Sequence, residues 1–365
     1  MTDSEGIEKY IQTHLRGFTG YSASTSPDTL KGKVDVPLEK IVKMNANENP
    51  YGCSPKVIKA LSKARNFNIY PDDGQQELRK AISDYAGVPP QCVVAGHGSN
   101  TLIDFLVRLF VAPGDEVINS VPTFDLYRFS TLICGGKLVN LERDDNFNIS
   151  VKDIKGAITD RTRLIFLATP NNPTGNLVPR EEIIELIETG LPIVVDEAYY
   201  EFSGETVMPL TQEYKNLIVL RSFSKWAGLA GLRVGYGVFP ARVASALMAI
   251  KIPHNVSVAA EIAVKESLAD LNYLQGRVKA MIAERSRLFS ELQSINWLKA
   301  YPSKANFIYC AVLKGSASEL HQKLQKKGVL VRYFDNPLLK NSIRISIGKP
   351  EHTDTLMKAL HQIEP

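Results

Sequence analysis

Lys225 and its chain neighbours are the clearest candidates for a reactive site in this sequence. The chain reads RSFSK at 221–225, at the end of an apolar run over residues 217–222. A lysine that is desolvated beside other cations has a lowered pKa, so its neutral amine can form a Schiff base with an aldehyde. Arg233, eight positions further on, offers a fixed positive charge for a phosphate. Most lysines are solvated surface residues, so this pattern needs support from elsewhere in the chain.

A carboxylate occupies a comparable place at Asp196, directly after the apolar residues 193–195. Its side chain should be largely desolvated, and a buried charge requires a partner. The partner could be a cation of the protein core or a helix start. The protonated ring nitrogen of a bound cofactor would satisfy the carboxylate equally well.

Two turns of unusual composition follow other apolar runs. GHGSNT at 96–101 precedes a helical pattern, and glycines before a helix start let free N–H groups approach a phosphate. TPNNPTG at 169–175 is a stiff turn with two amides, and such amides can hydrogen-bond an aromatic oxygen. Either segment could also be an ordinary turn without a function, because Gly, Pro and Asn are common turn residues. Their position after strands favours a functional interpretation.

The apolar runs themselves are typical of strands buried on both faces. They alternate with helical patterns and lie at 92–96, 116–120, 163–168, 192–198 and 217–222. This alternation predicts an α/β fold with a mainly parallel central sheet covered by helices. In such sheets ligands bind outside the carboxyl ends of the strands, where all four reactive groups are found.

The rest of the chain follows other patterns. A helical stretch over 258–293 precedes strands expected at 306–313, 329–334 and 342–347, with a helix at 316–327. Ile7, Ile11 and Leu15 share helical spacing, and residues 21–37 are rich in polar residues and Pro. We therefore expect an N-terminal helix and arm (1–44), a large α/β domain (45–252) and a smaller α+β domain (253–365).

Composition excludes several other classes of protein. The 43 basic and 39 acidic residues leave a net charge of only +4 without a basic run, which argues against nucleic-acid binding. The four cysteines are scattered without metal or redox spacing, as expected in a reducing compartment. No run approaches the roughly 18–20 apolar residues of a membrane span, and the polar N-terminus does not resemble a signal peptide. We expect a cytoplasmic protein with no metal, nucleic-acid or membrane partner.

Together the reactive groups meet the needs of pyridoxal 5′-phosphate (PLP): a phosphate cradle, a carboxylate for the ring nitrogen, donors for the ring oxygen and a lysine for the aldehyde. The motifs NNPTG (171–175), DEAY (196–199) and SFSKWAGLAGLRVG (222–235) resemble those of fold-type I PLP-dependent aminotransferases of class I/II. The chain is most similar to the histidinol-phosphate aminotransferases. That resemblance spans nearly the whole chain from about residue 20 and rests on NANENPYGCSP (45–55), YPDDGQQELR (70–79), GHGSN (96–100), LIVLRSFSKWAGLAGLR (217–233), GVLVRYF (328–334) and IRISIG (343–348).

The resemblance implies three catalytic residues: Lys225, Asp196 and Tyr199. Lys225 would hold PLP as a Schiff base and then move a proton between the substrate Cα and the cofactor, while Asp196 pairs with the ring nitrogen. Phe124 takes the place of the family's ring-stacking aromatic residue. The full set implied in cofactor binding is Gly98, Ser99, Asn100, Phe124, Asn172, Asp196, Tyr199, Ser222, Ser224, Lys225, Arg233 and, from the other subunit of a homodimer, Tyr70.

The resemblance also implies the reaction, in which L-histidinol phosphate and 2-oxoglutarate give imidazole acetol phosphate and L-glutamate in histidine biosynthesis. Two arginines could clamp the phosphomonoester, because guanidinium groups bind such dianions in bidentate geometry. The implied substrate-binding residues are Tyr21, Asn47, Asn172, Arg332 and Arg344. Around Tyr21 the chain reads GYSASTSPD and lacks the family's usual preceding Pro and following basic residue.

Other functions remain open at this point. An aromatic amino-acid aminotransferase would use Arg344 for a carboxylate, and a threonine-phosphate decarboxylase would also need phosphate-binding arginines. SFSK at 222–225 fits the S-x-x-K pattern of serine acyl-enzymes, but the accompanying S-D-N and K-T-G motifs do not occur. A PLP-binding DNA regulator would need an additional N-terminal domain.

Overall fold

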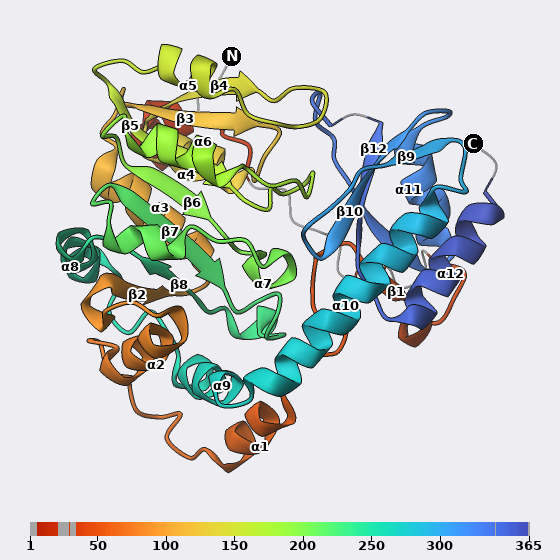
Figure 1. The fold of residues 1–365 in the computed structure, drawn as a ribbon, viewed down its shortest axis with the longest axis horizontal. Coiled ribbons are helices and arrows are strands. Elements are labelled where there is room, and N and C mark those ends of the chain that lie inside the picture. The colour runs from red at the N-terminus through yellow and green to blue at the C-terminus, as the bar shows by residue number, and fades with distance from the viewer. Residues whose placement is uncertain (1–5, 21–28, 30–33, 340, 364–365) are drawn as a thin grey trace.

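The computed structural model describes residues 6–20, 29, 34–339 and 341–363 and builds them around two β-sheets (Figure 1). The larger sheet has the order β2-β8-β7-β6-β5-β3-β4. Its strands are β2 (Val93–Gly96), β3 (Glu116–Val121), β4 (Lys137–Glu142), β5 (Thr162–Ala168), β6 (Ile193–Asp196), β7 (Leu217–Ser222) and β8 (Gly235–Val238). Strand β8 is antiparallel to β2 and β7, and every other neighbouring pair is parallel. All five expected strands form, and β4 and β8 add to them.

Alternating side chains of the large sheet enter two separate cores. On β5, Leu164 and Phe166 join one hydrophobic cluster, whereas Ile165 and Leu167 join the other. A sheet that is apolar on both faces must be covered on both, which explains the uninterrupted apolar runs in the sequence. The helices of this half of the molecule are α1 (Pro55–Lys63), α2 (Gln76–Ala86), α3 (Ser99–Phe110), α4 (Leu126–Ile133), α5 (Val151–Gly156), α6 (Arg180–Ile187), α7 (Tyr200–Ser203) and α8 (Ala241–Ile250).

The smaller sheet has the order β1-β11-β12-β10-β9. Its strands are β1 (Val42–Met44), β9 (Leu298–Ala300), β10 (Phe307–Val312), β11 (Val329–Tyr333) and β12 (Ser342–Ser346), with helices α11 (Ala317–Lys326) and α12 (Pro350–His361) beside them. Strand β1 comes from the segment expected to be an arm and pairs in parallel with β11. Residues far apart in the chain therefore share this sheet.

Helices α9 (Val258–Leu268) and α10 (Leu271–Leu292) replace the single helical stretch expected over 258–293. The break falls at Ala269 and Asp270, and Asp270 leaves the helical conformation with φ −130°. Helix α10 runs from the large sheet's helices to the small sheet and so connects the two halves of the molecule (Figure 1). None of the helices described is both long and apolar enough to cross a bilayer.

The prediction of a helix at the N-terminus is wrong for the residues that the structure describes. The chain instead forms two short 3₁₀ turns, Ile7–Tyr10 and Thr13–Leu15. Ile7 and Ile11, which should have formed its apolar stripe, remain exposed. A short helix gains most of its stability from packing, so an unpacked stripe does not sustain one.

Close packing requires a glycine at Gly235 in β8. A Cβ there would lie 2.5 Å from the backbone N of Ser99 and 2.9 Å from the carbonyl oxygen of Arg221. Both contacts are backbone atoms that cannot move aside cheaply. The start of α3 can therefore approach β7 only because this position carries no side chain.

We predict that Gly235→Ala lowers the free energy of unfolding by about 1–3 kcal/mol, the usual cost of overpacking. Gly276→Ala in α10 is the matched control, because a Cβ added at that position would meet nothing within 4 Å. That control should be neutral or stabilising by up to about 1 kcal/mol. Urea unfolding of both variants measures the difference, and equal stabilities would contradict the packing argument.

Candidate active site

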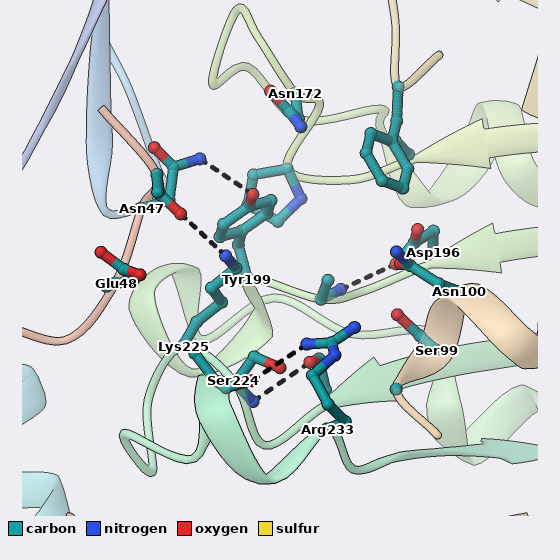
Figure 2. Close-up of a pocket in the computed structure, with 18 of the residues that line it drawn as sticks. Asn47, Glu48, Ser99, Asn100, Asn172, Asp196, Tyr199, Ser224, Lys225 and Arg233 are labelled. Carbon is teal, nitrogen blue, oxygen red and sulfur yellow. Dashed lines mark hydrogen bonds between the residues drawn. The ribbon is translucent and has the colours of Figure 1, made fainter. Parts of the chain in front are cut away.

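A cavity of about 360 Å³ lies at the carboxyl edge of the large sheet and reaches the small sheet (Figure 2). Its walls come from the ends of β5, β6 and β7, from the start of α3, from the segment after β1 and from β12. The predicted site residues that line it are Asn47, Gly98, Ser99, Asn100, Phe124, Asn172, Asp196, Tyr199, Ser222, Ser224, Lys225, Arg233 and Arg344. Tyr70 and Arg332 do not line it, and Tyr21 lies outside the described residues.

Lys225 projects into this cavity from the turn after β7 (Figure 2). Its Nζ donates a hydrogen bond to the carbonyl oxygen of Ala46, at 3.1 Å. Burial, together with the charges of Arg344 and Arg233, lowers the pKa of Lys225 from 10.5 to about 8. Near neutral pH far more of this amine is therefore uncharged and nucleophilic than in a solvated lysine.

Asp196 ends β6 with its carboxylate at the cavity, and the side chain is almost fully buried. Its Oδ2 accepts a hydrogen bond from the Tyr127 hydroxyl at 2.9 Å, and its Oδ1 accepts one from the backbone N–H of Ala198 at 3.1 Å. Burial raises the pKa of Asp196 to about 6, although both hydrogen bonds act in the opposite direction. Since both donors are uncharged, a cationic group in the cavity would complete the surroundings of this carboxylate.

Tyr127 is a site residue that sequence reasoning missed. Its ring is fully buried in α4, stacked on Phe166 at 4.6 Å and edge-on to Phe124 at 5.8 Å. An aromatic residue on a helix is most often core, and nothing in its neighbourhood signalled a partner on β6. The hydroxyl reaches Asp196 because Tyr127 packs on Phe166 of β5, and β6 is the neighbouring strand.

The opposite end of the cavity is built for an anion. Gly98 has φ +77° and directly precedes α3, so the first N–H groups of that helix face the cavity. A Cβ at Gly98 would lie 2.9 Å from the Arg233 guanidinium, which therefore rests against this turn. Ser222 and Ser224 add hydroxyls from the end of β7 (Figure 2). A phosphate would meet N–H groups, hydroxyls and one fixed positive charge here.

Tyr199 and Asn172 lie between the two ends. The Tyr199 hydroxyl accepts a hydrogen bond from Nδ2 of Asn47 at 3.0 Å. Arg344 donates to the Asn172 side-chain oxygen and, at 3.0 Å, to the carbonyl of Asn45. Phe124 borders the cavity with its ring, as expected of a stacking residue.

Arg332 and Arg344 are opposite each other on the neighbouring strands β11 and β12. Arg344 is nearly buried and reaches the cavity, whereas Arg332 is partly exposed and stays outside its walls. Both guanidinium groups lie over the ring of Phe334, at 5.3 Å and 5.7 Å from its centroid. The two positive charges therefore lie near each other on the small sheet, with only Arg344 at the reactive groups.

Tyr70 lies at the surface of a single chain, with 80% of its area exposed. Its ring stacks on His254 at 4.7 Å between centroids. Neighbouring apolar side chains are exposed as well, namely Phe67, Ile69, Ile250 and Ile252. Within one chain this tyrosine takes no part in the cavity.

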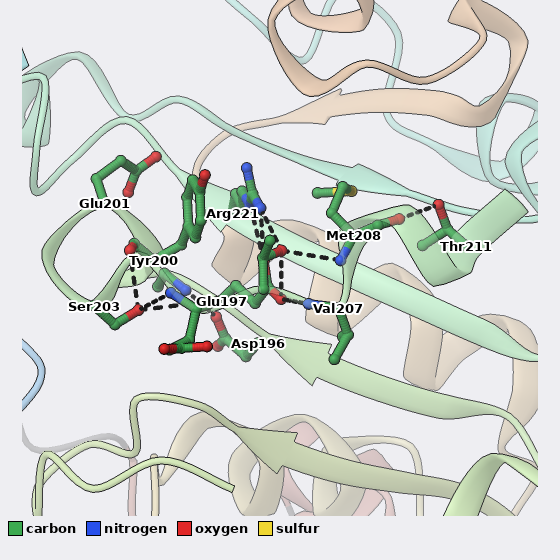
Figure 3. Close-up of polar contacts among 12 residues, drawn as sticks. Asp196, Glu197, Tyr200, Glu201, Ser203, Val207, Met208, Thr211 and Arg221 are labelled. Carbon is green, nitrogen blue, oxygen red and sulfur yellow. Dashed lines mark hydrogen bonds and ion pairs between the residues drawn. The ribbon is translucent and has the colours of Figure 1, made fainter. Parts of the chain in front are cut away.

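A buried ion pair joins Arg221 and Glu197 (Figure 3), which are the chain neighbours of two cavity-lining residues, Ser222 and Asp196. Arg221 donates two hydrogen bonds to Oε2 of Glu197, at 3.0 Å and 2.8 Å, and both side chains are almost completely buried. Glu197 also accepts hydrogen bonds from the Thr206 hydroxyl and from the Val207 N–H. Arg221 precedes Ser222 and Glu197 follows Asp196, so the pair ties together the ends of β6 and β7.

We predict that Arg221→Met lowers the free energy of unfolding by about 3–5 kcal/mol, because Glu197 is left charged and buried without its partner. The double variant Glu197→Leu with Arg221→Met should lose less, since Glu197 no longer leaves a buried charge without its partner. Urea unfolding of both proteins checks this expectation. If the double variant is as unstable as the single one, packing rather than charge explains the loss.

The arrangement can be compared with what an aldehyde cofactor needs. It offers an amine of lowered pKa at Lys225, a buried carboxylate at Asp196, an anion cradle between α3 and Arg233 and an aromatic face at Phe124. Among the described residues no group of three His, Cys, Asp or Glu side chains is placed to hold a metal ion. The residues therefore fit PLP, with its phosphate in the cradle and its ring nitrogen at Asp196.

Comparisons with known proteins agree with this chemistry. Residues 39–360 match the family aminotransferase class I and II. The chain is 50% identical over 357 residues to a histidinol-phosphate aminotransferase of Dehalococcoides mccartyi, covering 98% of each chain. It is 40% identical to that of Roseiflexus castenholzii, covering 98% of this chain and 99% of the relative. A solved histidinol-phosphate aminotransferase of Sinorhizobium meliloti in complex with PLP superposes with a TM-score of 0.86, at 27% identity and over 96% and 97% of the two chains. The predicted fold class is confirmed.

Proposed function

The chain belongs to the class I and II aminotransferase family, and we propose that it transfers the amino group of L-histidinol phosphate to 2-oxoglutarate with PLP as cofactor. The products are imidazole acetol phosphate and L-glutamate, which places the enzyme in histidine biosynthesis. The observation that carries this proposal is the 50% identity to a histidinol-phosphate aminotransferase over 98% of both chains. The lysine, carboxylate and anion cradle of the cavity supply the chemistry that the reaction requires.

PLP, when bound, supplies an aldehyde that captures an amine and a protonated ring that withdraws electrons from the bound substrate. Gly98, Ser99, Asn100, Ser222, Ser224 and Arg233 would hold its phosphate end. Asp196 would keep the ring nitrogen protonated, Phe124 would stack on the ring, and Asn172 and Tyr199 would hydrogen-bond the ring oxygen. The neutral form of Lys225 that burial favours is the form that attacks an aldehyde.

Lys225 would have a second role, as the group that moves a proton. Its Nζ would remove the proton from the substrate Cα and deliver it to the cofactor carbon that held the aldehyde. A pKa near 8 suits both directions of this transfer, because neither the charged nor the neutral amine is strongly favoured.

The phosphate of the substrate is the feature that separates this function from that of an aromatic amino-acid aminotransferase. Arg344 at the cavity and Arg332 beside it would bind the phosphomonoester, with Asn47 and Tyr21 as further contacts to the substrate. An aromatic amino-acid aminotransferase needs only one of these arginines, for a carboxylate. A threonine-phosphate decarboxylase needs both, so it is the second candidate that the pair of arginines supports.

We predict that the purified holoenzyme, given L-histidinol phosphate without an oxo acid, loses the visible absorption of the PLP form and gains that of the aminated cofactor. Lys225→Ala should abolish this conversion. Phenylalanine and O-phosphothreonine serve as comparison donors, the latter with assay of carbon dioxide. Conversion by phenylalanine alone, or release of carbon dioxide from phosphothreonine, would overturn the proposed substrate.

The protein is proposed to act as a homodimer in which Tyr70 completes the site of the other subunit. The exposed apolar residues around Tyr70 support this assignment, since a monomer rarely displays such a group without a partner. Residues 45–252 and 253–365 would form the two domains of each subunit, with the cavity where they meet. A cytoplasmic location is supported by the four free cysteines, which lie apart on the chain.

We predict complementation between two inactive variants, Lys225→Ala and Tyr70→Ala. Mixed after unfolding and refolding, they should recover roughly a quarter of wild-type activity, because half of the dimers are mixed and each mixed dimer has one intact site. The control is a chain that carries both substitutions, which should stay inactive when it is mixed with either single variant. No recovery from the mixture of the two single variants would show that Tyr70 does not act across an interface.

A further inference from the structure

Asn47 makes three hydrogen bonds with two residues in or next to the small sheet, Ser346 and Asn306. It is buried, with a left-handed backbone at φ +55°, a conformation that Asn tolerates better than most residues. Its backbone N–H donates to Oγ of Ser346 at 2.8 Å, and its carbonyl accepts from Nδ2 of Asn306 at 2.9 Å. Ser346 is the last residue of β12, so the position of Asn47 is set by a strand 299 residues further along the chain.

The side chain of Asn47 continues this chain of hydrogen bonds toward the cavity. The Ser346 hydroxyl lies 2.8 Å from Oδ1 of Asn47. Nδ2 of Asn47 lies 3.0 Å from the Tyr199 hydroxyl (Figure 2). Ser346 gives its proton to Oδ1, so the amide must present its N–H groups to Tyr199. The Tyr199 oxygen then accepts from Asn47, and its own proton is kept for a different acceptor.

We propose that Ser346 is a positioning residue, which orients the Asn47 amide and thereby directs the Tyr199 proton toward the ring oxygen of the cofactor. This inference rests on the proposed function, since it presumes PLP in the cavity. Ser346 is not among the residues that line the cavity. It acts through Asn47, and its effect is to decide whether the Tyr199 hydroxyl donates or accepts at the ring oxygen.

Loss of the Ser346 hydroxyl frees the amide to turn over. Oδ1 can then face Tyr199 and take its proton, which withdraws one hydrogen bond from the ring oxygen. The negatively charged ring oxygen becomes a stronger base when it loses a hydrogen-bond donor. The pKa of the bound cofactor should therefore rise. An ordinary hydrogen bond corresponds to a shift of about one pH unit.

The test is a spectrophotometric pH titration of the cofactor's visible band in the holoenzyme. Ser346→Ala should raise the midpoint by about one unit relative to wild type. Ser346→Cys keeps a side chain of similar shape but replaces the hydroxyl by the weaker S–H donor, so the midpoint should rise by less. This variant tests the proposal even if the alanine variant folds poorly. Ser342→Ala is the matched control, because Ser342 is equally buried on β12 but donates to the carbonyl of Leu339.

A double variant separates positioning from a general effect on structure. Asn47→Gly suits the left-handed backbone and removes the amide, so the additional change Ser346→Ala should then move the midpoint no further. A shift that persists in the glycine background, or a wild-type midpoint in both Ser346 variants, would overturn the role of Ser346. Absence of a titrating band in the wild-type protein would instead contradict the proposed function itself.

Discussion

The buried ion pair between Glu197 and Arg221 is the interaction on which the reactive geometry depends. Each partner is the immediate chain neighbour of a site residue, Asp196 on β6 and Ser222 on β7. This contact, made by two hydrogen bonds, therefore adds a side-chain link between two strand ends that the β6–β7 backbone ladder already holds side by side. The remaining lone pairs of Glu197 are also satisfied, by Thr206 and Val207, which is the condition under which a buried charge pair can be tolerated.

In the neighbouring cavity, burial acts both on a group that can be positive, Lys225, and on a group that can be negative, Asp196. Burial moves Lys225 toward its neutral form and also moves Asp196 toward its neutral form. The protein without cofactor thus carries the cost of two partly suppressed charges. A ligand with a cationic ring nitrogen restores the charge of Asp196 and consumes the neutral amine, so binding relieves both. This explains how one buried cavity can be specific for a molecule as polar as PLP.

Much of this site could be predicted from sequence because its residues directly follow apolar runs. Asp196 and Lys225 each come just after a strand's apolar residues, and the carboxyl ends of parallel strands meet at one edge. Tyr127 and Ser346 could not be found in this way, since their roles depend on which strands and helices become neighbours. Strand β8 was missed because it is short and contains two glycines, one of them Gly235. The spacing of Ile7, Ile11 and Leu15 wrongly predicts a helix, because periodicity does not reveal whether anything packs against these side chains.

The separation of Asn47 and Ser346 by 299 residues has a consequence for how the protein matures. One wall of the cavity is made early in synthesis and the other only when β12 has emerged, close to the C-terminus. Contacts between such distant residues carry a large loop-closure entropy and form late in folding. A chain that is still being translated can complete the large sheet with the residues proposed to hold the cofactor, whereas the side of the pocket that carries Arg344 is finished only in a nearly full-length product.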